Sequence, residues 1–112
     1  MMSRISFVEL PASDLSSARS FYADAFGLAF TDFGPIYSCT LTGDVDLGLQ
    51  GDAGEASSAP LAVIAANDLE ASFEAVGEAG GVITKPIFAF PGGRRFHFRD
   101  PSGNELAALK AD

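Results

Sequence analysis

His97 is the only histidine in this 112-residue sequence. An imidazole has an ordinary pKa of about 6.5, so His97 is the candidate group for proton transfer at neutral pH. It would act as a general base or as a hydrogen-bonding group for a ligand, oriented by the carboxylate of Glu9. The alternative is a histidine at a strand edge, bonded to backbone or water. In that case Glu9 would be a partly buried carboxylate paired with Arg95 or Arg4.

Arg94, Arg95 and Arg99 form the one basic cluster on an otherwise acidic chain. Closely spaced guanidinium groups can clamp a carboxylate or a phosphate. They can equally form a solvated surface that balances nearby Asp and Glu side chains. The sequence leaves both interpretations open.

The composition argues against several classes of protein. Fifteen acidic residues against seven basic ones give a net charge of -8, which repels nucleic acids and anionic membranes and favours a cationic ligand. Apolar runs are far shorter than the roughly 20 residues that cross a bilayer, and charges interrupt the apolar start, unlike a signal peptide. One cysteine and one histidine form neither an internal disulfide nor a structural zinc site, so we expect a cytoplasmic protein and a buried, unreactive Cys39.

Turn residues and apolar periodicity predict the elements that must position these groups. Strands are expected at 5–10, 28–33, 36–42, 45–50, 61–65, 82–87, 94–99 and 105–109. A helix should follow Ser13 or Asp14 and end at Gly27, and a second should follow Asn67 or Asp68 and end at Gly80-Gly81. Their buried stripes would be Leu15, Ala18, Tyr22, Ala25 and Phe26, with Phe21 also in the core, and Leu69, Phe73, Val76 and Ala79.

The expected elements read βαβββ twice. A constant offset of 54 carries Asp14-Leu15 onto Asp68-Leu69 and Gly27 onto Gly81, since 68 minus 14 and 81 minus 27 agree. Two capped helices can share such residues by chance, but the matching strand order favours a duplication. We therefore expect a single domain over 1–112, with module one at 4–50, a small polar linker at 51–59 and module two at 60–110.

Several segments resemble the vicinal oxygen chelate superfamily, which includes glyoxalase I, bleomycin resistance proteins and extradiol dioxygenases. The most specific is FRDPSGNEL at 98–106, a strand, an Asp-Pro turn and another strand that end a βαβββ repeat. FVELPASDL at 7–15, ARSFY at 18–22 and FG at 26–27 extend the likeness over nearly the whole chain. FPGGRRFHF at 90–98 is similar to a subgroup of small glyoxalase-like proteins.

This resemblance implies an α+β fold in which two tandem βαβββ modules form a partly open curved sheet or barrel. The helices would lie outside and a ligand cleft inside. Members of the family commonly pair as dimers, sometimes by exchanging modules, so we expect a homodimer.

Metal-dependent members of the family carry His, Gln or Glu at four inward-facing strand positions. The corresponding positions here are Phe7, Leu61, Ala107 and either Leu47 or Leu49. None has a lone pair for a metal, and a one-residue shift that brought Asp46 inward would add only one carboxylate. We therefore expect no metal and no cofactor. The arginine that glutathione-using relatives place after the first strand falls on Pro11, which also argues against glutathione.

The family's frame and strand alternation together predict which side chains line the cleft. Glu9 shares a face with Phe7, and Glu105 shares one with Ala107. His97 resembles a pocket-lining position, and Arg95 and Arg99 have its parity, whereas Phe96 and Phe98 would pack under the helices. The expected ligand-contacting set is Phe7, Glu9, Leu49, Leu61, Arg95, His97, Glu105 and Ala107.

The leading hypothesis is a metal-free protein that binds a small hydrophobic or aromatic, including cationic, compound in that cleft, without catalysis. Ten phenylalanines can supply an apolar wall. One alternative is a cofactorless isomerase, epimerase or lyase that uses His97 and Glu9 as acid and base. Others are a module that recognises another protein through its dimer surface, and a metal-dependent glyoxalase-like enzyme if the ligand positions are mapped wrongly.

Overall fold

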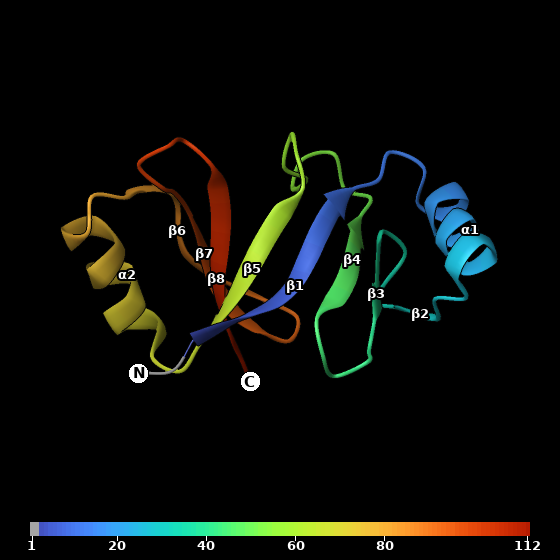
Figure 1. Ribbon diagram of the computed structural model, residues 1–112, viewed down its shortest axis with the longest axis horizontal. Helices are drawn as coiled ribbons and strands as arrows, with labels where there is room; N and C mark the ends of the chain where they lie inside the picture. Colours follow the sequence, from blue (N-terminus) through green and yellow to red (C-terminus); the bar gives the residue numbers. More distant parts are fainter. Residues whose placement is uncertain (1–2) are drawn as a thin grey trace. The chain divides into compact units, whose positions relative to one another are not determined.

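The computed structural model describes residues 3–112 of the chain (Figure 1). In chain order its elements are β1 (Ser3–Pro11), α1 (Leu15–Phe26), β2 (Phe30–Asp32), β3 (Tyr37–Thr40), β4 (Asp46–Gln50), β5 (Leu61–Ala66), α2 (Leu69–Glu78), β6 (Val82–Phe90), β7 (Gly93–Arg99) and β8 (Glu105–Ala111). Within residues 3–112, neither helix is long and apolar enough to cross a membrane.

The chain divides into two compact units. Unit one comprises residues 7–61, and unit two comprises residues 62–112 together with the start of β1. In unit one the strand order is β2-β3-β4-β1, with β1 parallel to β4 and the other pairs antiparallel. Unit two repeats this pattern as β5-β8-β7-β6, with β5 parallel to β8. The predicted α+β class and its tandem βαβββ organisation are confirmed.

The core of unit two lies between α2 and the sheet. Asp68 begins α2 by accepting a hydrogen bond from the backbone N–H of Ala71 at 3.0 Å. Phe73 of the predicted apolar stripe then packs edge-to-face onto Phe96 of β7 at a ring separation of 5.2 Å. Further members of this cluster are Ala66, Leu69, Val76, Ile83, Ile87, Phe98 and Ala108. Phe96 and Phe98 therefore lie under the helix, as alternation predicts. The assignment of Ala79 to the apolar stripe is wrong, because Ala79 follows the helix and is exposed.

In unit one, α1 begins and ends where the sequence predicts, but several of its residues that were expected to be buried are exposed. Asp14 caps its start and Gly27 ends it in the left-handed region, with φ of 70°. Phe21 and Phe26 remain 59% and 70% exposed and Ala25 is exposed too, so the assignment of these three residues to the helix core is wrong. The strands that α1 contacts are short, since β3 has four residues and β4 has five. Such a small sheet covers only part of a twelve-residue helix.

The turn between β7 and β8 sets the register of the strands that it joins. Asp100 Oδ1 accepts hydrogen bonds from the backbone N–H groups of Ser102 and Asn104, each at 2.9 Å. These bonds and the one from the Asn104 amide lower the pKa of the Asp100 carboxyl, with the Asn104 side chain as the largest cause. The closed turn places Arg99 opposite Glu105 and His97 opposite Ala107.

Candidate functional site

The imidazole of His97 lies on the face of the unit-two sheet opposite α2. The side chain is fully buried. Its Nδ1 lies 3.2 Å from Glu105 Oε2, because Glu105 sits diagonally across from His97 in the β7–β8 pair. The Thr84 hydroxyl donates a hydrogen bond to the same Oε2, also at 3.2 Å. On the other side of the ring, Nε2 is buried with no hydrogen-bond partner among the described residues.

These contacts define the state of the imidazole. A carboxylate oxygen accepts hydrogen bonds, so Nδ1 carries the proton that it donates to Glu105, and Nε2 carries a lone pair. Burial lowers the pKa of His97, and the positive charges of Arg95 and Lys85 add to this, while Glu105 opposes it. The ring is therefore neutral at pH 7, with Nε2 as a buried acceptor.

Aromatic side chains from β6 lie over this part of the sheet. The guanidinium of Arg95 is 5.7 Å from the centroid of the Phe88 ring and 5.6 Å from that of Phe90. The Phe88 ring also lies 5.9 Å from the imidazole of His97. The pairing of β6 with β7 shifts register on both sides of Lys85. Pro86 stands in the second shift, where it has no N–H to donate to the ladder.

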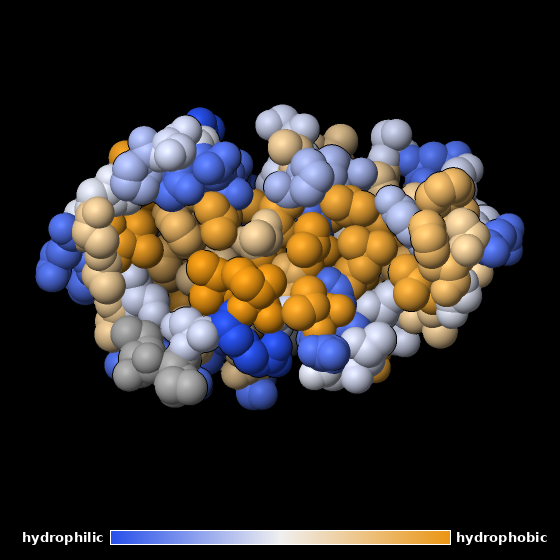
Figure 2. Space-filling model, viewed as in Figure 1, coloured by the Kyte–Doolittle hydropathy of each residue, from blue (hydrophilic) through white to orange (hydrophobic). Residues whose placement is uncertain are grey.

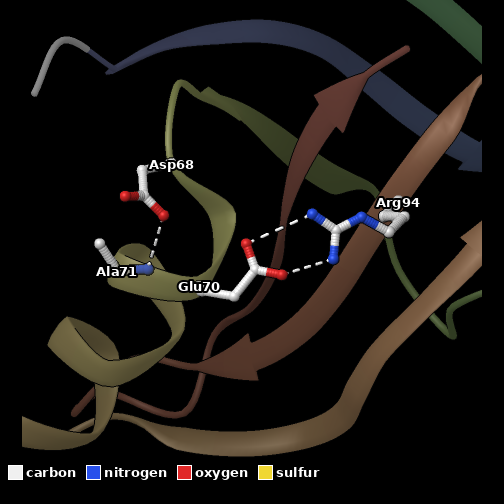
Figure 3. A network of polar contacts seen from close by, with 4 residues as sticks. All are labelled: Asp68, Glu70, Ala71 and Arg94. Atoms are coloured by element: carbon white, nitrogen blue, oxygen red, sulfur yellow. Dashed lines mark hydrogen bonds and ion pairs between the residues drawn. The ribbon is translucent and has the colours of Figure 1, made fainter.

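The three arginines do not form one cluster. Arg94 points to the α2 face, where its guanidinium makes two contacts with the Glu70 carboxylate at 2.5 and 3.3 Å (Figure 3). Arg95 lies on the opposite face with His97, and Arg99 is exposed near the turn. An anion clamp built from all three is therefore excluded by strand alternation.

Glu9 is held in unit one by a residue that the sequence did not single out. It is only 2% exposed, and the Tyr37 hydroxyl donates to its Oε1 at 3.0 Å. Glu9 pairs with Gly48 across β1 and β4. A Cβ on Gly48 would lie 2.4 Å from the Tyr37 hydroxyl, so the missing side chain is what lets the tyrosine cross β4. The isolated glycine inside this strand is the sequence feature that could have indicated that another side chain crosses here.

The structure separates the predicted site residues by face. Arg95, His97, Glu105 and Ala107 share the face of unit two opposite α2, and Leu61 at the start of β5 is fully buried. Phe7 and Glu9 share one face of unit one with Asp46 and Gly48.

Two expectations are corrected by these contacts. Leu49 is paired with Ser38 and Leu10, on the face where Arg19 of α1 contacts Asp32, so it lies under the helix rather than beside Glu9. The carboxylate that orients His97 comes from Glu105 rather than Glu9. Alternation predicts faces, but the register between strands decides which residues meet.

The architecture is that of a known family. A family model described as "Glyoxalase/Bleomycin resistance protein/Dioxygenase superfamily" matches residues 4–108 of the chain. The chain belongs to this superfamily. No functionally curated protein matches the sequence.

Several solved structures share this fold at low sequence identity. A hypothetical protein from Bacillus halodurans C-125 superposes with a TM-score of 0.83 at 10% identity, over 100% of this chain and 96% of the other. Methylmalonyl-CoA epimerase from Mycobacterium tuberculosis gives 0.75 at 14% identity, over 96% and 87%. The Mn(II)-bound glyoxalase from Novosphingobium aromaticivorans gives 0.68 at 21% identity, over 97% of this chain and 40% of the other. Identities this low indicate a shared fold.

This superfamily member has a cysteine in a position that suppresses its reactivity. Burial, reinforced by the negative charges of Asp46 and Glu9, raises the pKa of the Cys39 thiol to about 11. The thiolate is the reactive species, so we expect iodoacetamide at about pH 8 to modify folded protein at least tenfold more slowly than urea-unfolded protein. Mass spectrometry reads the result directly, because the chain has one cysteine. Equal rates in the two states would contradict the burial of this thiol.

The state of His97 also predicts a pH dependence of stability. Its pKa in the folded protein lies below the ordinary value of 6.5, so the unfolded chain takes up a proton first as the pH falls. The free energy of unfolding should therefore be constant above about pH 7 and decrease as the pH falls through 6.5 toward the folded pKa. Urea unfolding at about pH 7.5 and about pH 5.5 measures this decrease. Carboxyl groups whose pKa is lowered, such as that of Asp46, change the free energy of unfolding only at lower pH.

The control for this prediction is the neutral variant His97→Gln. It removes the titrating group, so its free energy of unfolding should lose most of the change between the two pH values. An undiminished change in the variant would show that another group titrates in this range.

Proposed function

We propose that this superfamily member binds a small hydrophobic or aromatic compound at the face of unit two that carries His97, and that it does so without a metal. The observation that carries the proposal is the buried Nε2 of His97, which has no partner among the described residues although the Phe88 ring lies beside it. Buried polar atoms are nearly always satisfied, so an unsatisfied one next to aromatic walls is typical of a ligand site.

The donor atoms support the metal-free part of the proposal. Phe7, Leu61 and Ala107 stand at positions where the family resemblance implies metal ligands, and Gly48 shares the face of Phe7 on β4. None of them offers a nitrogen, oxygen or sulfur side-chain atom. Asp46 also lies on this face of β4, but its carboxylate already accepts hydrogen bonds from Thr40, Thr42 and Gly43. Within residues 3–112, no three His, Cys, Asp or Glu side chains gather closely enough to hold an ion. The residues present therefore do not fit the Mn(II) of the Novosphingobium glyoxalase.

Thermal unfolding of the purified protein tests both parts. We expect no change in Tm with manganese, nickel or zinc, and an increase with at least one of 4-methylphenol, 4-methylbenzoate and 4-methylbenzylammonium. His97→Ala should reduce that increase. A metal-induced increase that EDTA reverses would overturn the metal-free proposal. A flat response to all three aromatic compounds would overturn binding at this face.

A second candidate is proton transfer by His97, favoured by its hydrogen bond to Glu105. A neutral imidazole whose Nδ1–H is held by a carboxylate can accept a proton at Nε2. In that reaction the proton of a carbon acid passes to Nε2, and the electron pair of the C–H bond moves into the adjoining carbonyl to form an enolate. Return of the proton from the imidazolium restores the carbon acid.

Methylmalonyl-CoA is a suitable probe for this candidate, because four of the similar structures are described as methylmalonyl-CoA epimerase. Incubation in D₂O with wild type and with His97→Ala would reveal deuterium incorporation at carbon by mass spectrometry. Incorporation that depends on His97 would establish the enzyme, whereas a rate equal to that without protein would exclude it for this substrate. Glu9, the other acid–base candidate, is tested in the same way with Glu9→Gln.

We also propose that the protein is a cytoplasmic homodimer with no nucleic-acid partner, and that α1 contributes to the contact between copies. Figure 2 shows tan and orange residues over α1, at the right of the view. Its Phe21 and Phe26 are exposed, as are Phe33 and Ile36 in the segment between β2 and β3. Exposed aromatic residues are typical of protein interfaces. Sedimentation equilibrium should show a dimer that Phe26→Ser weakens, and a monomer at all concentrations would refute it.

A further inference from the structure

The contacts of His97 define the kind of ligand group that its free nitrogen can take. Nδ1 already donates to Glu105, whose Oε2 is also held by the Thr84 hydroxyl. This leaves Nε2 as an acceptor only, so a ligand must present a hydrogen-bond donor to it. A carbonyl, an ether or a carboxylate oxygen would face the lone pair and leave the buried nitrogen unsatisfied.

The charges around the ring restrict that donor further. Arg95 on β7 and Lys85 on β6 both act on His97 as positive charges, and Glu105 is the negative charge that acts on it. Glu105 is engaged by Nδ1 and Thr84 on the far side of the ring from Nε2. The positive charges that lower the pKa of His97 also oppose a protonated amine beside the ring, whereas they do not oppose a neutral or weakly acidic O–H group. This reverses the preference for cationic ligands that the net charge of the chain indicates.

The position of the Phe88 ring indicates the chemical nature of the rest of the ligand. Its ring is half-buried, lies next to the imidazole, and belongs to the part of β6 where the pairing with β7 is irregular. Phe90 follows on the same face, because both rings contact Arg95. Aromatic rings favour other rings in offset or edge-to-face arrangements. An aromatic ligand whose polar group reaches Nε2 would therefore pack against the Phe88 ring.

We propose that the His97 site takes an aromatic O–H compound, such as a phenol or an enol, whose hydroxyl donates a hydrogen bond to Nε2. Glu105 is the positioning residue, because it holds the imidazole in the tautomer that can accept this bond. The inference rests on the proposed binding function and adds the chemical class of the ligand and the role of Glu105.

The test uses ¹⁵N-labelled protein, because a single histidine gives a single imidazole spectrum. In the free protein at about pH 8, the two nitrogen shifts should identify Nδ1 as protonated and Nε2 as bare. Glu105→Ala should lose this preference, and the matched control Glu70→Ala should keep it. Glu70 carries the same charge but pairs with Arg94 on the α2 face (Figure 3). A free protein with Nε2 protonated would overturn the inference.

Three matched probes then test the ligand class by titration against the same nuclei. We expect 4-methylphenol to shift the Nε2 resonance and to bind about tenfold more tightly than 4-methylanisole, which lacks the donor, and 4-methylbenzylammonium, which carries a charge. Equal binding of all three would overturn the inference while leaving the proposed function intact. No binding of any of these probes would overturn the ligand class, and a flat response to 4-methylbenzoate as well would overturn the proposed function.

Discussion

Replacing Phe96 with alanine is expected to lower the free energy of unfolding by about 3 to 5 kcal/mol, the usual cost of removing a buried phenylalanine. Phe96 is fully buried and is the largest such side chain in the described chain, residues 3–112. Its ring packs against Phe73 of α2 and against Phe98. The variant would lose both ring contacts and leave a cavity under the helix. Since a domain of this size is stable by only about 5 to 15 kcal/mol, much of the total would be lost.

Urea unfolding followed by circular dichroism measures this effect, with Val82→Ala as the control. Val82 lies on the neighbouring strand of the same unit and is 62% exposed, so its truncation should change stability by less than about 0.5 kcal/mol. Equal losses in the two variants would mean that the core of unit two is not organised around Phe96.

Phe96 also shows how much of this fold can be predicted from the sequence. Asp14 and Asp68 cap the helices at the predicted offset of 54, because caps depend on neighbours in sequence. The glycines at positive φ that follow the helices are Gly27 and Gly80, so the helix ends are offset by 53 (80 minus 27) rather than 54. The face of each residue in 94–99 follows from alternation, which places Phe96 under α2 and His97 opposite it. These features need no knowledge of which strands pair.

The features that the sequence did not predict depend on pairing. His97 meets Glu105 rather than Glu9 because the Asp100 turn sets the register of β7 on β8. Thr84 reaches the same carboxylate where β6 departs from regular pairing, and Tyr37 reaches Glu9 over a glycine on another strand. Leu49 lies under α1 because of the register of β4. Such contacts are fixed by long-range geometry, which alternation in one strand does not encode.

The register of β7 on β8 is also the reason for the second large loss of stability that we expect. Gly93 opens β7 directly opposite Ala111 of β8. A Cβ at this position would lie 2.3 Å from the Lys110 carbonyl oxygen and 3.0 Å from the Ala111 Cα. Both are backbone atoms, so no side-chain rotation can relieve the overlap, and the two strands would have to move apart. We expect Gly93→Ala to cost about 3 kcal/mol, at the upper end for overpacked sites.

Gly77→Ala is the matched control, and its sign should be opposite. Gly77 lies inside α2, where an added Cβ would meet no atom within 4 Å. Replacing glycine by alanine in an open helix position should stabilise the protein by about 0.5 to 1 kcal/mol. The same methyl group would thus destabilise one variant and stabilise the other, so any general effect of the substitution is controlled.

The Gly93 variant also links packing to the candidate site, because the pair of strands it disturbs is the one that brings Glu105 to His97. If the strands separate only at the Gly93 end, the imidazole should keep its Nδ1–H tautomer in the ¹⁵N spectrum while stability falls. If β8 slides along β7, Glu105 would leave Nδ1 and the tautomer preference would be lost. The Asp100 turn holds the other end of the pair, because the backbone N–H groups of Ser102 and Asn104 donate to the Asp100 carboxylate and that of Gly103 donates to its carbonyl oxygen. We therefore expect the first result, with the site intact in the fraction of molecules that remains folded.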